Sequence, residues 1–174
     1  MNTNNKTKNI VLTALFAAMI CITIAFLFHI PTGFNGGYIH LGDTLIYLAA
    51  VLLPTPYAMV AAALGASLAD ILMGGMIWVI PTIIIKSLMV IFFTSKADNI
   101  ICKRNIIAVF IAGFVGCFGY YLAGAIISGN FIAPLATLYL EFIQPLVSGI
   151  IFLVAGYSLD KIKIRDKISH ASAK

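Results

Sequence analysis

Charged residues are scarce in this chain of 174 residues. Asp, Glu, Lys and Arg together make up 10% of it, whereas hydrophobic residues make up 61%, and the mean hydropathy is +1.05. A soluble domain of this length and composition has too few polar side chains to cover its outside. The composition therefore excludes a soluble globular protein and indicates an integral membrane protein.

The motifs of several common activities are also missing. The chain has no Gly-Lys-Ser/Thr phosphate loop, so any ATP-driven work must come from another subunit. It has no His-Glu-x-x-His, Gly-x-Ser-x-Gly or Cys-x-x-Cys arrangement, and no inverted repeat of the kind found in many secondary transporters. The three cysteines lack the spacing of a metal site or a disulfide framework. We therefore predict that the chain is not an enzyme and that it binds no metal or other cofactor.

Long apolar runs fill most of the sequence. A helix needs about 20 apolar residues to cross a hydrocarbon core of about 30 Å, and Pro54, Pro56 and the Gly74-Gly75 pair break the longest run. We predict an all-α bundle of six membrane-spanning helices that forms a single transmembrane domain over residues 1–174. The expected spans cover residues 10–30, 43–53, 57–74, 80–94, 106–128 and 134–159.

The basic residues predict the orientation of these spans. Six crossings place both termini, the turn at 54–56 and the loop 95–105 on the same side, and this side holds ten of the eleven Lys and Arg residues. Lys and Arg are enriched in cytoplasmic loops. We therefore expect cytoplasmic termini and read the net charge of +5 as a signal of topology rather than of nucleic-acid binding.

A glycine-rich stretch, Gly36 to Tyr47, carries a histidine and a carboxylate into the second span. Glycine permits sharp turns and close approach of the backbone, so we interpret the loop 31–41 as a lid over a small-molecule site. Tyr38, His40 and Asp43 are its candidate binding residues. His29 and His40 with Asp43 could bind a metal, but their spacing is not diagnostic.

Four ionisable residues lie within or at the edge of the spans: Asp43, Asp70, Lys86 and Glu141. Each costs about 2.5–3.5 kcal/mol at the centre of a spanning helix, so each needs a partner or a wet cavity. At 1.5 Å per residue, all four fall in the outer half, none deeper than about 10 Å from the outer end of its span. They line an outward-facing pocket, or they form a structural ion pair between Lys86 and either Asp70 or Glu141, and the two interpretations are compatible.

Two further patterns concern ligand and partner contacts. Trp78 and several tyrosines lie near the outer side, where they form an interfacial belt or stack on a planar ligand. In the first span, Ala14, Ala18, Cys21 and Ala25 follow one helix face. Such a stripe of small residues lets another helix approach closely, either from a partner protein or from within the bundle.

With these features the sequence resembles the substrate-binding S components of energy-coupling-factor (ECF) vitamin transporters. The resemblance rests on the size, the six spans and three local patterns: Ala14-x-x-x-Ala18; His40-Leu41-Gly42-Asp43 with Leu53-Pro54-Thr55-Pro56-Tyr57 and Gly65 to Asp70; and Ile80-Pro81 to Lys86. The second and third patterns are most similar to the hydroxymethylpyrimidine or pyridoxine branch, and the riboflavin and pantothenate branches are more distant. Pro54-Thr55-Pro56 departs from the Gly-Pro expected there.

The resemblance implies a function and partners. The chain would capture a vitamin or precursor at the outer face of a prokaryotic plasma membrane and then topple in the membrane to release it inward. A transmembrane coupling subunit, docked on Ala14 and Ala18, and two ATPase subunits would drive uptake. The substrate-binding candidates are Asp43, Asp70, Lys86, Glu141, Trp78, His40 and Tyr38. The alternatives are a small membrane enzyme that uses Asp70 and Glu141 as acid and base, a structural membrane protein, or an S component for riboflavin or pantothenate.

Overall fold

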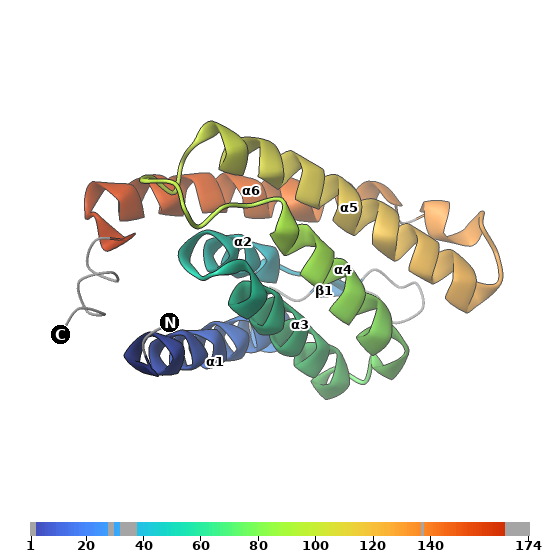
Figure 1. Cartoon of the computed structure of the whole chain (residues 1–174). Helices are drawn as coiled ribbons and strands as arrows, with labels where there is room; N and C mark the ends of the chain where they lie inside the picture. The colour runs from blue at the N-terminus through green and yellow to red at the C-terminus, as the bar shows by residue number, and fades with distance from the viewer. Residues whose placement is uncertain (1–2, 28–29, 32–37, 137, 166–174) are drawn as a thin grey trace.

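The computed structural model of the chain describes residues 3–27, 30–31, 38–136 and 138–165 (Figure 1). It is all-helical apart from one pair of two-residue strands, which confirms the predicted fold class. The elements are α1 (Thr3–Phe26), β1 (Ile30–Pro31), β2 (Tyr38–Ile39), α2 (Gly42–Leu52), α3 (Thr55–Leu72), the 3-10 helix η1 (Met76–Trp78), α4 (Val79–Ile91), α5 (Lys103–Ser128), the 3-10 helix η2 (Ala133–Ala136) and α6 (Leu138–Lys161).

The central element is the short helix α2. It contacts α1, α3, α4 and α6, while α1, α3, α4, α5 and α6 pack against one another in that order around it. Figure 1 shows α5 and α6 side by side above α2, with α1 and α3 below. Because α2 is apolar on nearly every face and enclosed by neighbours, eight of its eleven residues are buried.

Proline and glycine set the helix ends as the sequence predicts. Leu53 is extended before Pro54, and Pro56 lies in the first turn of α3, where its missing N–H leaves no helical hydrogen bond unmade. Gly74 and Gly129 follow α3 and α5 with φ of +77° and +63°, a conformation that other residues adopt only with strain. These turns fix the antiparallel course of the chain.

Small residues let the helices approach closely. A Cβ built on Gly65 of α3 would lie 2.6 Å from the backbone oxygen of Ala17 and 2.8 Å from the Cβ of Ile20, both on α1. A larger side chain at Gly65 would force α1 and α3 apart. The α1–α3 contact therefore uses Ala17 and Ile20, and it leaves Ala14 and Ala18 exposed on other parts of α1.

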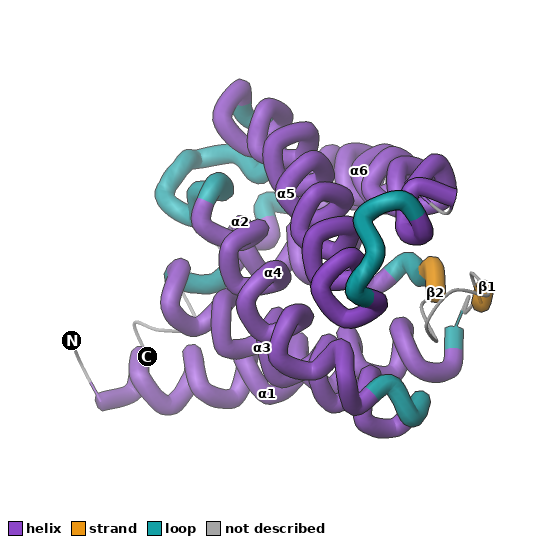
Figure 2. The backbone as a smooth tube through the Cα atoms, turned by 90° about the vertical axis from the view of Figure 1, so that its right-hand side faces the viewer, coloured by secondary structure: helices purple, strands orange, loops and turns teal. Residues whose placement is uncertain are grey.

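The strands β1 and β2 pair antiparallel, with Ile30 opposite Ile39 and Pro31 opposite Tyr38. Figure 2 shows them at the edge of the bundle, shortly before α2 begins. The predicted lid, 31–41, lies mostly outside the described residues, since 32–37 are not among them. His29 is not among them either.

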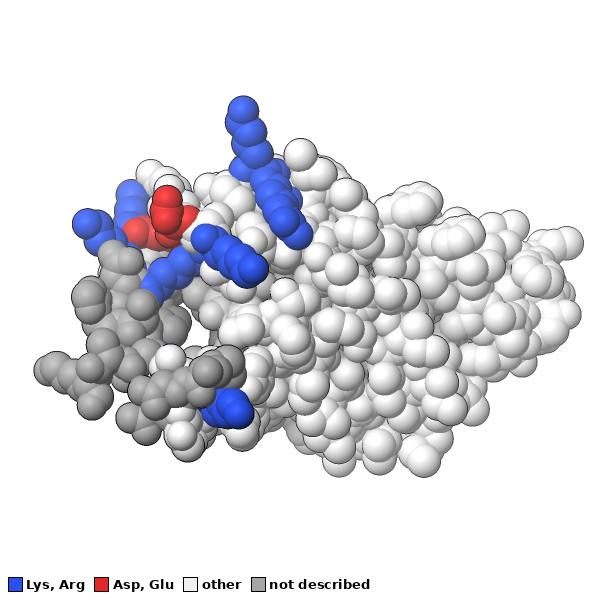
Figure 3. All heavy atoms as spheres, in the orientation of Figure 1, with Lys and Arg blue, Asp and Glu red and all other residues white. Residues whose placement is uncertain are grey.

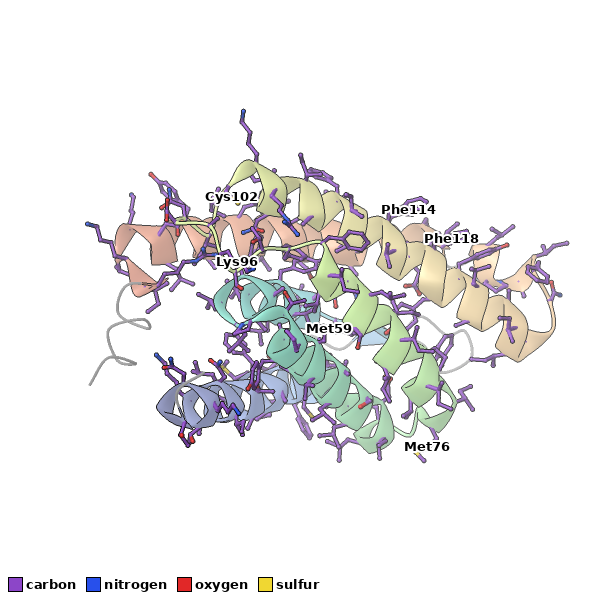
Figure 4. The ribbon with its side chains drawn as sticks, in the orientation of Figure 1. Met59, Met76, Lys96, Cys102, Phe114 and Phe118 are labelled. Carbon is purple, nitrogen blue, oxygen red and sulfur yellow. The ribbon has the colours of Figure 1, made fainter. Side chains whose placement is uncertain are left out.

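The outer surface of the bundle is apolar, as lipid contact requires. Among the described residues, four helices are long and apolar enough to cross a membrane: Asn5–Phe26, Thr55–Leu72, Lys103–Ser128 and Glu141–Lys161. The segments Gly42–Leu52 and Met76–Ile91 are shorter apolar helices of the same bundle. Phe114 and Phe118 illustrate the lipid-facing side: both are exposed on α5, with their rings stacked at 6.0 Å (Figure 4).

The charged side chains visible on the surface in Figure 3 gather at one end of the molecule. Figure 3 shows Lys and Arg at the end that carries the 95–102 loop and the end of α6. Among the described residues on this face, the opposite end displays neither acidic nor basic side chains. The asymmetry expected from the sequence is therefore present in three dimensions.

Candidate functional site

A buried ion pair joins α2 to α4. Lys86 Nζ lies 2.5 Å from Asp43 Oδ1, and the two side chains are 1% and 3% exposed. Such a pair is stable in an apolar interior only when the remaining hydrogen-bonding atoms also find partners. Lys86 pairs with neither Asp70 nor Glu141, the partners considered from the sequence, because α2 lies at the centre of the bundle and its first turn faces α4.

Gln144 of α6 completes the coordination of Asp43. Its side-chain N–H donates to Asp43 Oδ2 at 2.8 Å, and its carbonyl accepts the backbone N–H of His40 at 3.1 Å. The hydroxyl of Thr44 donates to the backbone carbonyl of Ser148 at 3.1 Å, also on α6. The amide of Gln144 thus ties the start of α2, and the residue that follows β2, to α6.

These groups line a small cavity between α2, α4, α5 and α6. Its volume is about 10 Å³, enough for about one water molecule, and its lining combines polar side chains with glycines, a methionine and a proline. The lining residues are Asp43, Lys86, Met89, Gly113, Gly116, Cys117, Tyr120, Glu141, Gln144 and Pro145. Polar groups therefore converge in one place inside an otherwise apolar bundle.

An aromatic wall borders the charged groups. Tyr120 lies below the ammonium of Lys86, with 5.2 Å from Nζ to the ring centroid, a distance suited to a cation–π interaction. Its hydroxyl is 3.0 Å from the hydroxyl of Thr82, and the ring of Trp78 lies 6.0 Å away. A flat ring in the cavity would find an aromatic face and hydrogen-bonding groups together.

Glu141 is the second carboxylate of the cavity. It lies in the first turn of α6, and it is close enough for the charges of Lys86 and Asp43 to act on it. Within the described part of the chain, no side chain forms an ion pair or hydrogen bond with its carboxylate. Cys117 donates only to the backbone carbonyl of Glu141, at 3.1 Å.

The structure thus brings together three of the predicted site residues, Asp43, Lys86 and Glu141. Asp70 is buried on α3 but does not line this cavity, so the acid–base pair of the enzyme alternative does not share it. Trp78 does not line the cavity either, but its ring lies beside that of Tyr120, which does.

The remaining predicted contacts are indirect or undescribed. His40 contributes its backbone N–H, while its ring Nδ1 accepts the N–H of Gly42 at 3.1 Å. Tyr38 belongs to β2, and its side chain lies outside the described part of the structure. Over the described residues, no group of three His, Cys, Asp or Glu is placed to hold a metal ion.

The sequence offers Gln144 only as a non-specific hydrogen-bonding group and Tyr120 only as one of several tyrosines near the outer side. Neither is among the predicted site residues. The stronger signal was on α6: Glu141, Gln144 and Ser148 recur at intervals of three and four residues. This spacing puts them on one helix face. A polar face on an apolar span marks the side that turns inward.

Comparison with protein families identifies the chain. The model of the ECF-type riboflavin transporter S component family matches residues 4–161, a range that begins within α1 and ends with α6. No curated protein and no solved structure matches it. The match confirms the resemblance to S components, whereas the assignment to the hydroxymethylpyrimidine or pyridoxine branch stays a prediction. The chain therefore belongs to the ECF-type riboflavin transporter S component family, and it is a substrate-binding subunit of a membrane transporter rather than an enzyme.

Proposed function

We propose that the chain captures a small vitamin or vitamin precursor with a planar heterocyclic ring in the cavity lined by Asp43, Lys86, Gln144, Glu141 and Tyr120. The observation that carries this proposal is the convergence of these polar groups in one cavity. Binding sites for small molecules combine an apolar lining with a few convergent polar groups.

A purely structural role accounts for only part of this arrangement. One ion pair between Asp43 and Lys86 would join α2 to α4, but it requires neither an additional carboxylate nor an open space beside it. Holding the half-buried Glu141 near Asp43 costs free energy, because two like charges share a region of low polarity. Ligand binding would explain why the carboxylate of Glu141 and a cavity lie beside the ion pair.

The cavity has a volume of about 10 Å³, far below the roughly 300–1,000 Å³ typical of pockets for drug-sized ligands, so any substrate would have to widen it. A single-ring substrate such as hydroxymethylpyrimidine or pyridoxine would need the smaller widening. Riboflavin is the second candidate, and the family description favours it. Its three fused rings and sugar-alcohol chain would require the helices around Gly113 and Pro145 to separate.

The proposed orientation places the cavity on the outer side of a prokaryotic plasma membrane. The Lys and Arg side chains gather at the end where α6 finishes, and such residues are enriched on the cytoplasmic side. Asp43 and Glu141 lie in the first turns of α2 and α6. The cavity therefore belongs to the end away from the positive charges, which would face the nutrient supply.

Transport would require partners that supply energy. In the proposal, a transmembrane coupling subunit docks on Ala14 and Ala18 of α1, and two ATPase subunits drive uptake through it. Both alanines are exposed, and their small side chains permit close helix contact. The neighbouring Ala17 is already used in the contact with α3.

The proposal is tested by ligand identification followed by titration. The purified protein in detergent is analysed by mass spectrometry for co-purifying small molecules, and the named vitamins are then titrated while the fluorescence of Trp78 is recorded. Trp78 is the only tryptophan of the chain, and its ring lies beside that of Tyr120, which lines the cavity. We expect Lys86→Ala to weaken binding at least tenfold, while Lys96→Ala in the exposed loop leaves it unchanged. Absence of binding for every vitamin tested would contradict the proposal.

A further inference from the structure

The cavity holds more negative than positive charge. Asp43 and Glu141 face one ammonium, that of Lys86, and no other Lys or Arg is among the lining residues. Lys86 already contacts Asp43, and the second oxygen of Asp43 accepts the amide of Gln144. Within the described part of the chain, Asp43 and Lys86 thus have side-chain partners, whereas the carboxylate of Glu141 has none.

The carboxylate of Glu141 can accept hydrogen bonds that no described side chain offers it. An ionised carboxylate is a pure acceptor with room for several donors. A ligand that enters the cavity and carries N–H or O–H groups would supply them. A ligand that carries its own carboxylate or phosphate would add a third negative charge beside a single ammonium, and like charges in a desolvated site disfavour binding.

We propose that Glu141 determines substrate specificity, by accepting hydrogen bonds from a neutral or cationic heterocycle and by excluding anionic vitamins. This inference rests on the proposed function, since it requires that the substrate occupies the cavity. It narrows the substrate class to rings with amino, hydroxyl or protonated ring-nitrogen donors. It also separates the alternatives left open by the sequence, because pantothenate, a carboxylate, is excluded whereas aminopyrimidines, pyridoxine and riboflavin are not.

A competing role for Glu141 is local stabilisation of α6. Carboxylates in the first turn of a helix interact favourably with its unpaired N–H groups and its dipole. That role requires no ligand, and it predicts that a substitution changes the stability of the protein without changing which vitamins bind. Ligand selectivity therefore distinguishes the two roles.

The test compares four vitamins on the wild-type protein and on Glu141→Gln. The probes are hydroxymethylpyrimidine and pyridoxine as donor-bearing rings, thiamine as a permanent cation and pantothenate as an anion, and the dissociation constants come from calorimetry. We expect the wild type to bind at least one of the first three and to bind pantothenate at least 100-fold more weakly. Glu141→Gln should weaken binding of the donor-bearing ligand roughly 10- to 100-fold, the usual effect of losing a hydrogen bond to a charged group. The ratio between the dissociation constants of pantothenate and of this ligand should therefore become smaller.

Asp98→Asn is the matched control, because it removes one carboxylate from an exposed position in the loop between α4 and α5, outside the cavity lining. It should leave all four constants unchanged. Equal or tighter binding of pantothenate by the wild type would overturn the inference while leaving the proposed function intact, and this comparison needs no variant to fold. A Glu141→Gln protein with unchanged selectivity would overturn it as well. If none of the four probes nor riboflavin binds the wild type, the proposed function fails and this inference with it.

Discussion

The ion pair between Asp43 and Lys86 predicts an unequal response to removing either partner. In Lys86→Met, Asp43 stays buried and keeps only the amide of Gln144. Breaking one side of a buried pair costs about 3–5 kcal/mol of folding free energy. Asp43 can take up a proton instead of remaining charged. At pH 7, protonating an ordinary aspartate costs about 4 kcal/mol, so this route lowers the free energy of unfolding by a similar amount.

Asp43→Asn should cost less than Lys86→Met. The ammonium of Lys86 then still has a carboxylate in the same cavity, that of Glu141, whereas Asp43 has no second cation among the lining residues. The double variant should be more stable than Lys86→Met, because it also removes the carboxylate of Asp43 and leaves Glu141 as the one charged side chain among the lining residues. Replacing a buried pair by neutral groups is often close to neutral in stability.

The assay is unfolding of the purified protein by stepwise addition of a denaturing detergent, followed by the fluorescence of Trp78. The four proteins form a double-mutant cycle, whose coupling energy isolates the pair. Lys96→Met serves as the control, since it removes a lysine from an exposed loop position. The reasoning is refuted if Lys86→Met is as stable as the wild type, or if the double variant is no more stable than Lys86→Met.

Three further changes test other parts of the molecule. Gln144→Leu removes the hydrogen bond to Asp43 and should lower stability by about 1–3 kcal/mol and weaken vitamin binding, as judged by the same unfolding and titration assays; full binding would exclude Gln144 from the site. Gly113→Val places a Cβ 2.9 Å from the Cβ of Pro145, so it should cost about 1–3 kcal/mol by overpacking and close the cavity; an unaltered dissociation constant would show that the ligand binds elsewhere. Ala14→Trp should leave binding intact but abolish ATP-driven uptake in reconstituted vesicles, and normal uptake would remove this face of α1 from the docking surface.

The sequence predicts the helices well, because hydropathy and helix-breaking residues are local signals. Six apolar segments, the break at Pro54 and the end of α3 before Gly74 all follow from composition and spacing. Only the ends shift: the first helix begins at Thr3 and ends at Phe26, whereas the apolar run predicted 10–30. Polar residues at a helix end still form helical hydrogen bonds, and hydropathy does not register them.

The arrangement of the site is less accessible from the sequence. Counting residues predicts similar depths for Lys86 and Glu141, and both line the cavity. However, α6 begins at Leu138 rather than at 134, so Glu141 lies in the first turn of its helix whereas Lys86 lies further along α4. Which groups meet depends on the rotation of each helix about its axis and on its neighbours. Lys86 pairs with Asp43 because α2 is the central helix, and nothing in the sequence of α2 alone distinguishes a central helix from a peripheral one.

The short length of α2 bears on how deep Asp43 lies in the membrane. Its eleven residues extend only about 16 Å, roughly half of a hydrocarbon core of about 30 Å. If its last turn lies at the cytoplasmic level of the 54–56 turn, its first turn lies within the membrane rather than at its outer edge. Asp43 is then deeper than a full-length span would place it.

A chain that stops being helical at this depth needs partners for its backbone. Irregular backbone is tolerated within the membrane only where protein buries it or where it lines a cavity. The backbone N–H of His40 meets this condition through the side-chain carbonyl of Gln144, and the amide of the same side chain reaches Asp43. One residue of α6 therefore satisfies both the backbone that precedes α2 and the carboxylate that begins it. A ligand that competes for this amide would act directly on His40, so the proposed binding cavity is linked by hydrogen bonds to the backbone that enters α2.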